Sequence, residues 1–177
     1  GVAKEILNEI KAQRALLDAE NGTIMVSVDT IPCSYLMHNV KKLFAGNPVA
    51  EDKIIDIPDA LEDFSFRCDS RLLTRVLGNM VKNALEASKH GDTVTMTCQR
   101  ENDRVVFAVR NSGFMSEETK LQIFRRAFST KGKGRGLGTY SIKLLTERYM
   151  KGRAYFKSTP EEGTTFYVDL PLDMDTV

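Results

Sequence analysis

Histidine and cysteine are scarce in this sequence of 177 residues, and no long apolar run interrupts it. The three cysteines (Cys33, Cys68 and Cys98) are far apart and form no CxxC pair, which disfavours a disulfide scaffold or a zinc site. No segment approaches the roughly 18 apolar residues of a membrane span, and the charged N-terminus does not have the pattern of a signal peptide. These features predict a protein that works in the reducing cytoplasm.

Charge of one sign is also missing. The 25 lysines and arginines balance 24 aspartates and glutamates, so the formal net charge is +1. This balance argues against bulk attraction to nucleic acid or to an anionic membrane, because either would require a local basic patch. A hydrophobic content of 42% is sufficient for a core, and the length suits one domain or one domain with an appendage.

The first segment of the chain has the periodicity of a helix, over residues 2–20, and Asn21-Gly22 is a typical helix end. Its apolar positions follow a heptad seam with one polar interruption. Such a seam packs either on another helix or on the helix's own domain, and the pattern leaves both open. The seam consists of Ala3, Ile6, Ile10, Gln13 and Leu17.

Beyond Gly22 the pattern mixes strands and helices without regular βαβ alternation, and the last strands form a hairpin. We therefore expect an α+β fold with helices on one face of a mixed sheet, rather than a doubly wound parallel sheet. Alternating threonines at 93–97 suggest that the other face is partly exposed. Strands are expected at 24–28, 53–57, 64–68, 93–100, 105–109, 154–157 and 165–170, and helices at 33–44, 69–90, 116–124 and 140–150.

Two asparagines stand out on the expected helix after residue 69. Asn79 and Asn83 continue a ridge that begins with Leu72 and Val76, so they point toward the interior or toward a cavity beside it. Amide oxygens can coordinate a hard cation, and amide nitrogens can bind a phosphate. The alternative is that both side chains bond neighbouring backbone.

A second polar motif, Asn111-Ser112-Gly113, follows directly on an apolar strand. Gly113 permits a turn and the close approach of a flat ligand, and rigid strand ends often carry binding residues. An ordinary turn is the alternative reading.

Between residues 128 and 138, four glycines alternate with basic and apolar residues, just before an expected helix. Glycines allow backbone N–H groups to converge, and a helix N-terminus adds partial positive charge, so the segment suits a triphosphate. A flexible linker or a basic loop for nucleic acid remains open. The residues concerned are Lys131, Gly132, Lys133, Gly134, Arg135, Gly136, Leu137 and Gly138.

In this order the three motifs resemble the ATP-binding domain of sensor histidine kinases, within the group that also contains gyrase, Hsp90 and MutL ATPases. The stretch 79–87 resembles the N box, 111–113 the first glycine box, 123–131 the F box and the start of the lid, and 134–138 the second glycine box. The segment 163–171 resembles the last strand of that domain.

This resemblance implies a two-layer α/β sandwich that binds ATP and Mg²⁺. It implies that Asn79 and Asn83 hold Mg²⁺ and phosphate, and that the first glycine box contacts adenine through Asn111 and Gly113. Lys131 and the backbone of the glycine loop, comprising Gly134, Arg135, Gly136, Leu137 and Gly138, would contact phosphates, and Thr164 would help to form the adenine pocket.

The sequence departs from the family pattern at two positions. Asn111 stands where aspartate is usual, so the charge-assisted contact with adenine is lost, and Met115 replaces a glycine. We expect nucleotide to bind despite both changes.

The histidines His38 and His90 lie inside the expected ATP-binding region, and neither has the sequence context of a phosphoacceptor histidine. The resemblance therefore implies that residues 1–22 are the end of the second helix of a dimerisation and phosphotransfer hairpin. Residues 23–177 would be the ATP-binding domain of a longer kinase that forms a homodimer through the hairpin, either as a cytoplasmic protein or as the cytoplasmic part of a membrane-anchored sensor. It would transfer the γ-phosphoryl group to a histidine on that hairpin, and then to a response-regulator partner.

Three other functions remain open. One is an ATPase of the gyrase or Hsp90 type, although those enzymes carry a catalytic glutamate where this chain has Asn79. Another is a protein-serine kinase, and a third is a module for contacts alone, such as a nucleic-acid binder that uses the basic segment 125–135.

Overall fold

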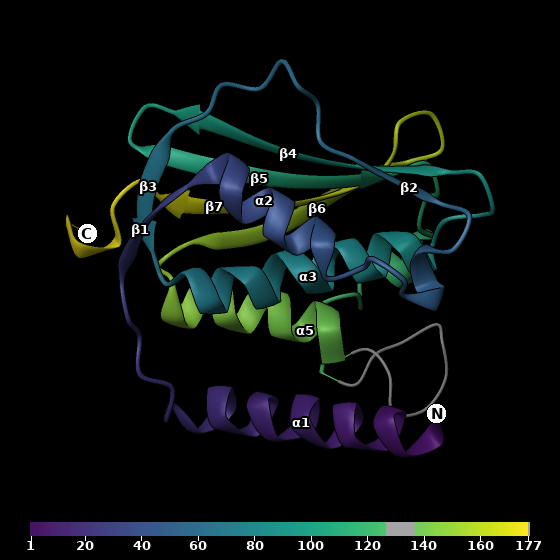
Figure 1. Ribbon diagram of the computed structural model, residues 1–177, viewed down its shortest axis with the longest axis horizontal. Helices are drawn as coiled ribbons and strands as arrows, with labels where there is room; N and C mark the ends of the chain where they lie inside the picture. The colour runs from purple at the N-terminus through teal and green to yellow at the C-terminus, as the bar shows by residue number, and fades with distance from the viewer. Residues whose placement is uncertain (127–136, 177) are drawn as a thin grey trace.

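The computed structural model describes residues 1–126 and 137–176. Its helices α2 (Cys33–Lys42), α3 (Ser70–Glu86) and α5 (Leu137–Leu144) form a layer on one face of a five-stranded sheet, and α1 (Val2–Asn21) lies beyond that layer (Figure 1). The expected Lys131, Gly134, Arg135 and Gly136 fall outside the described residues.

The main sheet has the strand order β2-β4-β5-β7-β6. Its strands are β2 (Ile54–Asp56), β4 (Thr93–Glu101), β5 (Arg104–Asn111), β6 (Arg153–Thr159) and β7 (Gly163–Pro171). Only β2 pairs in parallel with its neighbour, and the other pairs are antiparallel. A separate antiparallel pair joins β1 (Asp29–Pro32) to β3 (Ser65–Cys68). The expected mixed, mostly antiparallel sheet with helices on one face is confirmed.

The core lies between the helical layer and the inner face of the sheet. On β4 the side chains of Val94, Met96 and Cys98 are buried, whereas Thr95 and Thr97 between them are partly exposed on the outer face. This period of two is what the alternating sequence predicts for a sheet covered on one side. The amphipathic α3 buries eight side chains: Leu72, Leu73, Val76, Leu77, Met80, Val81, Ala84 and Leu85.

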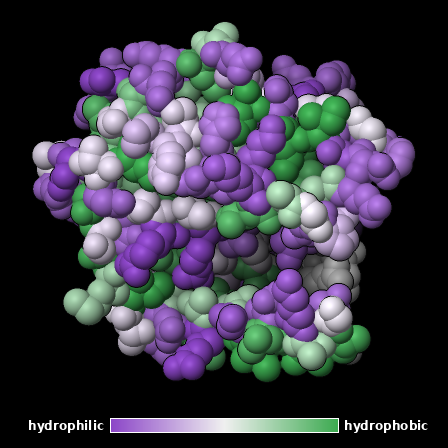
Figure 2. Space-filling model, in the orientation of Figure 1, coloured by the Kyte–Doolittle hydropathy of each residue, from purple (hydrophilic) through white to green (hydrophobic). Residues whose placement is uncertain are grey.

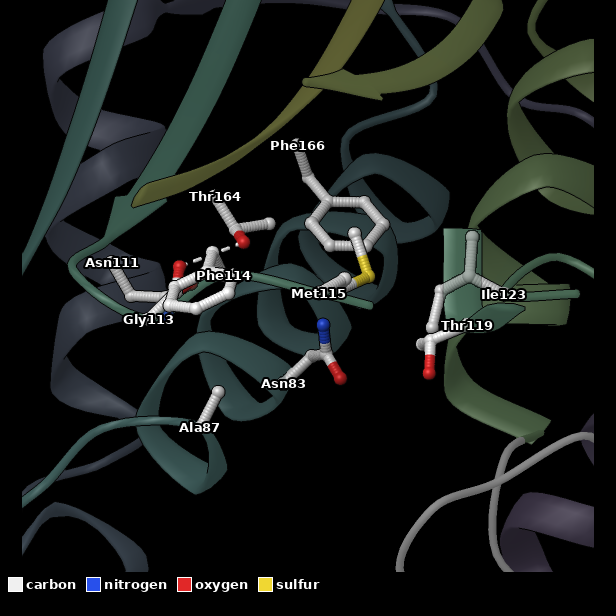
Figure 3. A pocket seen from close by; sticks show the side chains of 10 residues that line it. All are labelled: Asn83, Ala87, Asn111, Gly113, Phe114, Met115, Thr119, Ile123, Thr164 and Phe166. Atoms are coloured by element: carbon white, nitrogen blue, oxygen red, sulfur yellow. Dashed lines mark hydrogen bonds between the residues drawn. The ribbon is translucent and has the colours of Figure 1, made fainter. Parts of the chain in front are cut away.

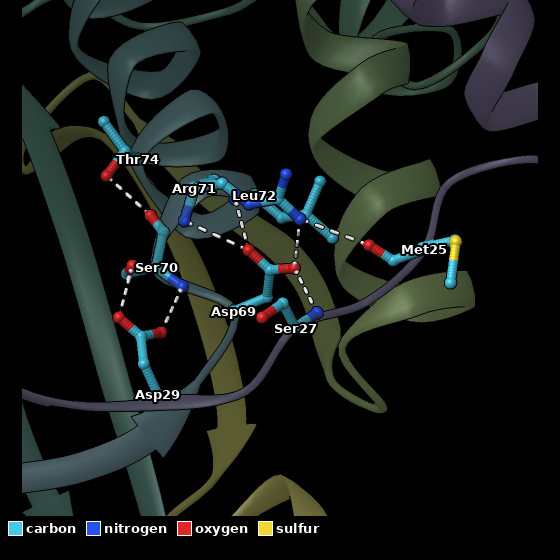
Figure 4. A network of polar contacts seen from close by, with 8 residues as sticks. All are labelled: Met25, Ser27, Asp29, Asp69, Ser70, Arg71, Leu72 and Thr74. Carbon is cyan, nitrogen blue, oxygen red and sulfur yellow. Dashed lines mark hydrogen bonds and ion pairs between the residues drawn. The ribbon is translucent and has the colours of Figure 1, made fainter.

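The start of α3 is fixed by Asp69, which is fully buried and whose polar contacts are drawn in Figure 4. Its carboxylate accepts hydrogen bonds from the backbone N–H groups of Arg71 and Leu72, as an N-cap does. The same carboxylate accepts the backbone N–H of Ser27 at 2.9 Å. Asp29 in turn accepts hydrogen bonds from the backbone and hydroxyl of Ser70. The segment that leads out of α1 is therefore attached to the N-terminus of α3.

Helix α1 is held mainly by its C-terminal end. Residues 1–14 are exposed, whereas Leu16 and Ala19 are buried. The carbonyl oxygen of Ala19 accepts a 2.6 Å hydrogen bond from Tyr149, and that of Glu20 accepts one from Arg148 at 2.7 Å. The helix thus contacts its own domain, while Ile6, Ile10 and Leu17 of the seam are more than half exposed. Within residues 1–126 and 137–176, no helix combines the length and apolarity needed to cross a bilayer.

Four of the expected elements differ from those in the structure. Residues 24–28 form no strand, because their backbone bonds to side chains at the start of α3: Met25 accepts from Arg71, and Ser27 donates to Asp69. Helix α3 ends at Glu86 rather than near residue 90, where Lys89 bonds to Asp92 in the following turn.

The expected helix at 116–124 is reduced to α4 (Glu117–Lys120), capped by Ser116. The expected helix at 140–150 instead begins at Leu137 as α5 and continues as the π-helix η2 (Leu145–Tyr149). Two short 3₁₀ helices complete the elements of the described residues, η1 (Pro48–Ala50) and η3 (Met174–Thr176).

Candidate functional site

A pocket of about 120 Å³ opens between the C-terminal half of α3, the end of β5, the start of β7 and the segment around α4 (Figure 3). It is smaller than the roughly 300–1,000 Å³ typical of sites that enclose a whole drug-sized ligand. A flat ring system is therefore a better match for it than a complete nucleotide. Its lining consists of Asn83, Ala87, Asn111, Gly113, Phe114, Met115, Thr119, Ile123, Thr164 and Phe166.

Helix α3 brings the two asparagines to one side of this pocket. Asn79 and Asn83 lie one turn apart and are both partly buried, and the side chain of Asn83 points into the pocket in Figure 3. Asn79 lies beside the start of α5, since a Cβ added at Gly138 would be 3.9 Å from its Cγ. The polar ridge of α3 therefore runs from the pocket to the N-terminus of α5, where Leu137 is the first residue.

Asn111 is the last residue of β5 and is only 3% exposed. It pairs with Thr164 across the antiparallel β5–β7 ladder, so two of the expected site residues are direct neighbours in the sheet. The Nδ2 atom of Asn111 has no hydrogen-bond partner among the described residues. Asn111 also lines the pocket, so a residue of the pocket wall carries a buried donor without an acceptor.

A chain of hydroxyl groups holds the turn after β5. Thr164 donates from Oγ1 to the carbonyl oxygen of Gly113 at 2.8 Å. Ser158 lies 2.8 Å from the same Oγ1 and accepts the backbone N–H of Met115 at 2.8 Å. Because each hydroxyl has one proton, Ser158 donates to Thr164 in this arrangement. The turn that carries Gly113 is therefore attached at two points to β6 and β7.

Aromatic side chains form the support under the segment 121–126. Phe124 packs against Phe156 and Phe166, with ring centroids 5.7 and 6.0 Å apart. Lys143 of α5 places its Nζ 5.2 Å from the centroid of the Phe124 ring. These contacts hold the neighbouring Ile123 at the pocket.

Amide oxygens at Asn79 and Asn83 suit a hard cation as part of its ligand set, provided that phosphate and water oxygens complete it. In the part of the chain that the structure describes, no group of three or more His, Cys, Asp or Glu side chains could hold a metal ion alone. The donor set therefore fits a cation that arrives with an anionic ligand.

The cysteines offer no nucleophile here. All three are buried, and burial raises the pKa of the Cys68 thiol to about 12 and also raises the pKa of Cys33 and Cys98. Protonated thiols are poor nucleophiles.

Of the expected site residues, Asn83, Asn111, Gly113 and Thr164 line one pocket, and Asn79, Leu137 and Gly138 lie along the same ridge or at the start of α5. Sequence reasoning named no other lining residue as a site residue, nor the supporting Ser158, although Ala87 and Ile123 lie in the stretches that resemble the N box and the F box. The alternating pattern of β7 could have indicated that Phe166 is buried, whereas the segment around Thr119 has no clear period.

Residues 68–174 match the family model described as "Histidine kinase-, DNA gyrase B-, and HSP90-like ATPase", and the chain belongs to this family. Sensor protein DegM of Bacillus sp. (strain B21-2) is 33% identical over 131 residues, which cover 72% of this chain and 35% of that protein. The chain thus spans about a third of the length of this curated relative.

Solved structures agree with this assignment. The catalytic domain of histidine kinase ThkA is 26% identical, with a TM-score of 0.75 over 85% of this chain and 99% of that one. ThkA in complex with the response regulator protein TrrA matches at 20% identity with a TM-score of 0.70, over 97% of this chain and 51% of that chain, and shows the same fold.

Proposed function

We propose that this chain is the ATP-binding catalytic domain of a sensor histidine kinase. The observation that carries the proposal is that Asn83, Asn111, Gly113 and Thr164, from three distant parts of the sequence, line one pocket in a domain of this ATPase family. The sequence similarity to DegM and to the ThkA catalytic domain supports the kinase branch of the family.

In this proposal the purine base occupies the pocket, with Asn111 as its polar partner and Phe166 and Ile123 as apolar walls. The phosphates then lie toward Asn79, Asn83 and the start of α5, where a helix N-terminus favours negative charge. Lys131, Gly134, Arg135 and Gly136 are proposed as phosphate contacts on the grounds of sequence alone, and Leu137 and Gly138 as contacts at the start of α5.

Mg²⁺ is proposed to bind between the nucleotide phosphates and the amide oxygens of Asn79 and Asn83. When bound, it would neutralise charge on the phosphates during transfer of the γ-phosphoryl group, a reaction that depends mostly on positioning and charge neutralisation. Asn79 and Asn83 would orient the ion, while Asn111 and Thr164 fix the position of the base.

The phosphoryl acceptor is proposed to be a histidine on a helical hairpin that these 177 residues do not include. Residues 1–22 would be the end of that hairpin, and residues 23–177 the ATP-binding domain. The exposed seam of α1 supports this division, because its apolar side chains suit a partner helix in a homodimer. Neither His38 nor His90 lines the pocket.

A response-regulator receiver domain is the proposed partner that takes the phosphoryl group onward, because ThkA has been solved in complex with a response regulator protein. We propose that these phosphoryl transfers take place in the cytoplasm, where the kinase would meet ATP and the receiver domain.

A hydrolytic ATPase is the main competing function. The resemblance puts Asn79, beside the proposed phosphates, where gyrase-type and Hsp90-type ATPases carry a catalytic glutamate, and an amide cannot take a proton from water as a carboxylate does. This observation favours a kinase domain that positions nucleotide over an enzyme that hydrolyses it.

Calorimetric titration of the 177-residue chain with Mg-ADP, followed by an assay of ATP hydrolysis, tests the proposal. We expect saturable binding at or below millimolar nucleotide, no sustained hydrolysis, and no acid-labile label on His38 or His90 from radiolabelled ATP. The absence of binding at millimolar Mg-ADP contradicts the proposal, and steady hydrolysis supports the ATPase.

A further inference from the structure

Asn111 presents an unusual group to the pocket. The residue is only 3% exposed and lines the pocket, and its buried Nδ2 atom lacks a hydrogen-bond partner in the described part of the chain. Leaving a buried donor without an acceptor is costly, so a ligand gains affinity by supplying the acceptor.

An amide carries a donor and an acceptor side by side. A 6-aminopurine can donate its amino hydrogen to Oδ1 and accept from Nδ2 at the adjacent ring nitrogen. A 6-oxopurine can accept from Nδ2 at O6 and donate its N1–H to Oδ1. A half-turn of the amide about its last bond exchanges the two atoms, so one side chain matches either edge.

The remaining polar side chains of the lining have other assignments in this proposal. Asn83 faces the phosphates and Mg²⁺, and the hydroxyl of Thr119 accepts a hydrogen bond from Ser116. The hydroxyl of Thr164 already donates to the carbonyl oxygen of Gly113 and accepts from Ser158. Five lining side chains are apolar and sense the shape of a ring rather than its hydrogen-bonding edge, namely Ala87, Phe114, Met115, Ile123 and Phe166.

We propose that the Asn111 amide lets this pocket accept both 6-amino and 6-oxo purine nucleotides, so that inosine nucleotides bind in the same site as adenosine nucleotides. The proposal rests on the nucleotide-binding function proposed above and specifies its base selectivity.

The test is calorimetric titration of the 177-residue chain with Mg-ADP and with Mg-IDP, which differ at position 6 and in the proton on N1. We expect the two dissociation constants to agree within about 10-fold, the difference that corresponds to roughly one hydrogen bond. Binding of ADP with IDP weaker by about 100-fold or more overturns the inference and leaves ATP binding intact. Absence of binding by either nucleotide defeats the proposed function and the inference with it.

The variant Asn111→Asp replaces the donor with a second acceptor, and its oxygen would repel O6. We expect the ratio of IDP to ADP dissociation constants to rise by about 10-fold or more, because a buried site rejects a group it cannot pair with. Asn102→Asp makes the same chemical change in the turn at the other end of β5, and should leave the ratio unchanged. Unfolding curves show whether each variant is folded, and an unchanged ratio in folded Asn111→Asp overturns the inference.

Discussion

Thr164 and Gly113 are joined by a 2.8 Å hydrogen bond between a buried hydroxyl and a backbone carbonyl, 51 residues apart in sequence. Thr164 of β7 pairs with Asn111 at the end of the β5–β7 ladder, and Gly113 lies in the turn just after Asn111. The bond therefore sets the position of the turn relative to the sheet, and with it the shape of the proposed base pocket.

Thr164→Val should weaken both folding and nucleotide binding. Valine keeps the shape but removes the hydroxyl, which leaves the Gly113 carbonyl and the Ser158 hydroxyl without their partner. We expect a loss of about 1–3 kcal/mol in the free energy of unfolding and at least about fivefold weaker ADP binding. Urea denaturation and calorimetry measure the two effects.

Thr165→Val is the matched control, because Thr165 is the next residue of β7, is only partly buried and points to the other face of the sheet. Equal losses in Thr164→Val and Thr165→Val would contradict a specific role for the Thr164 hydroxyl.

Asn83→Ala should remove much of the effect of Mg²⁺ on nucleotide affinity. The proposed site uses the Asn83 amide oxygen as a ligand, and interactions with charged groups are worth about 1.5–3 kcal/mol. We expect Mg-ADP binding to weaken about 10-fold or more, whereas binding of ADP in the presence of a chelator should change little. Calorimetry with and without Mg²⁺ measures the difference.

Lys82→Ala, at the adjacent and exposed position of α3, is the control for this change. Equal weakening of ADP binding with and without Mg²⁺ in Asn83→Ala would indicate a contact with the nucleotide alone.

Periodicity predicted the fold well where one local pattern decides the structure. The alternation Val94, Met96, Cys98 gave β4, and the apolar ridge of α3 led to the two asparagines. The strand expected at 24–28 was wrong because its backbone partners are the side chains of Asp69 and Arg71, which lie more than 40 residues away. A contact between residues so far apart produces no periodic pattern in the local sequence.

The candidate site was predicted from motifs that contain asparagine, glycine or threonine. Asn83, Asn111, Gly113 and Thr164 do line one pocket. Ser158, which connects Met115 to Thr164, was not selected, since it lies one residue beyond the strand expected at 154–157 and the sequence does not indicate that its side chain is buried. Its role depends on tertiary pairing between strands.

Asp63 should make folding stability depend on pH in the acidic range. Hydrogen bonds from the hydroxyl and backbone N–H of Ser34, and from the Cys33 thiol, hold the pKa of the Asp63 carboxyl below its ordinary value of 3.8. A lowered folded-state pKa means that the stabilisation is present above the unfolded pKa and is lost as the pH falls through the folded pKa. We therefore expect the advantage of the wild type over Asp63→Asn to shrink below about pH 4.

Urea unfolding at pH 7 and at pH 3 measures this difference. Asp59→Asn, an exposed change nearby, provides the control. A difference between wild type and Asp63→Asn that is the same at both pH values would contradict a role for the ionised carboxylate.

Gly163→Ala should destabilise the domain through the end of β5. Gly163 has a φ of +79°, where an L side chain is strained, and a Cβ there would be 2.3 Å from the carbonyl oxygen of Asn111. Strain and overpacking together predict a loss of about 2–5 kcal/mol in the free energy of unfolding.

Gly46→Ala separates the two causes of that loss. Gly46 has a similar φ of +72°, but nothing lies within 4 Å of an added Cβ. Gly46→Ala should therefore lower the free energy of unfolding only by the roughly 1–2 kcal/mol that a side chain costs in a left-handed backbone conformation. Because the carbonyl in contact with Gly163 belongs to Asn111, Gly163→Ala should also reduce ADP affinity, whereas Gly46→Ala should not. Similar unfolding free energies for the two variants would contradict the prediction, because they would mean that the close approach of Gly163 to the Asn111 carbonyl oxygen adds no cost to the substitution.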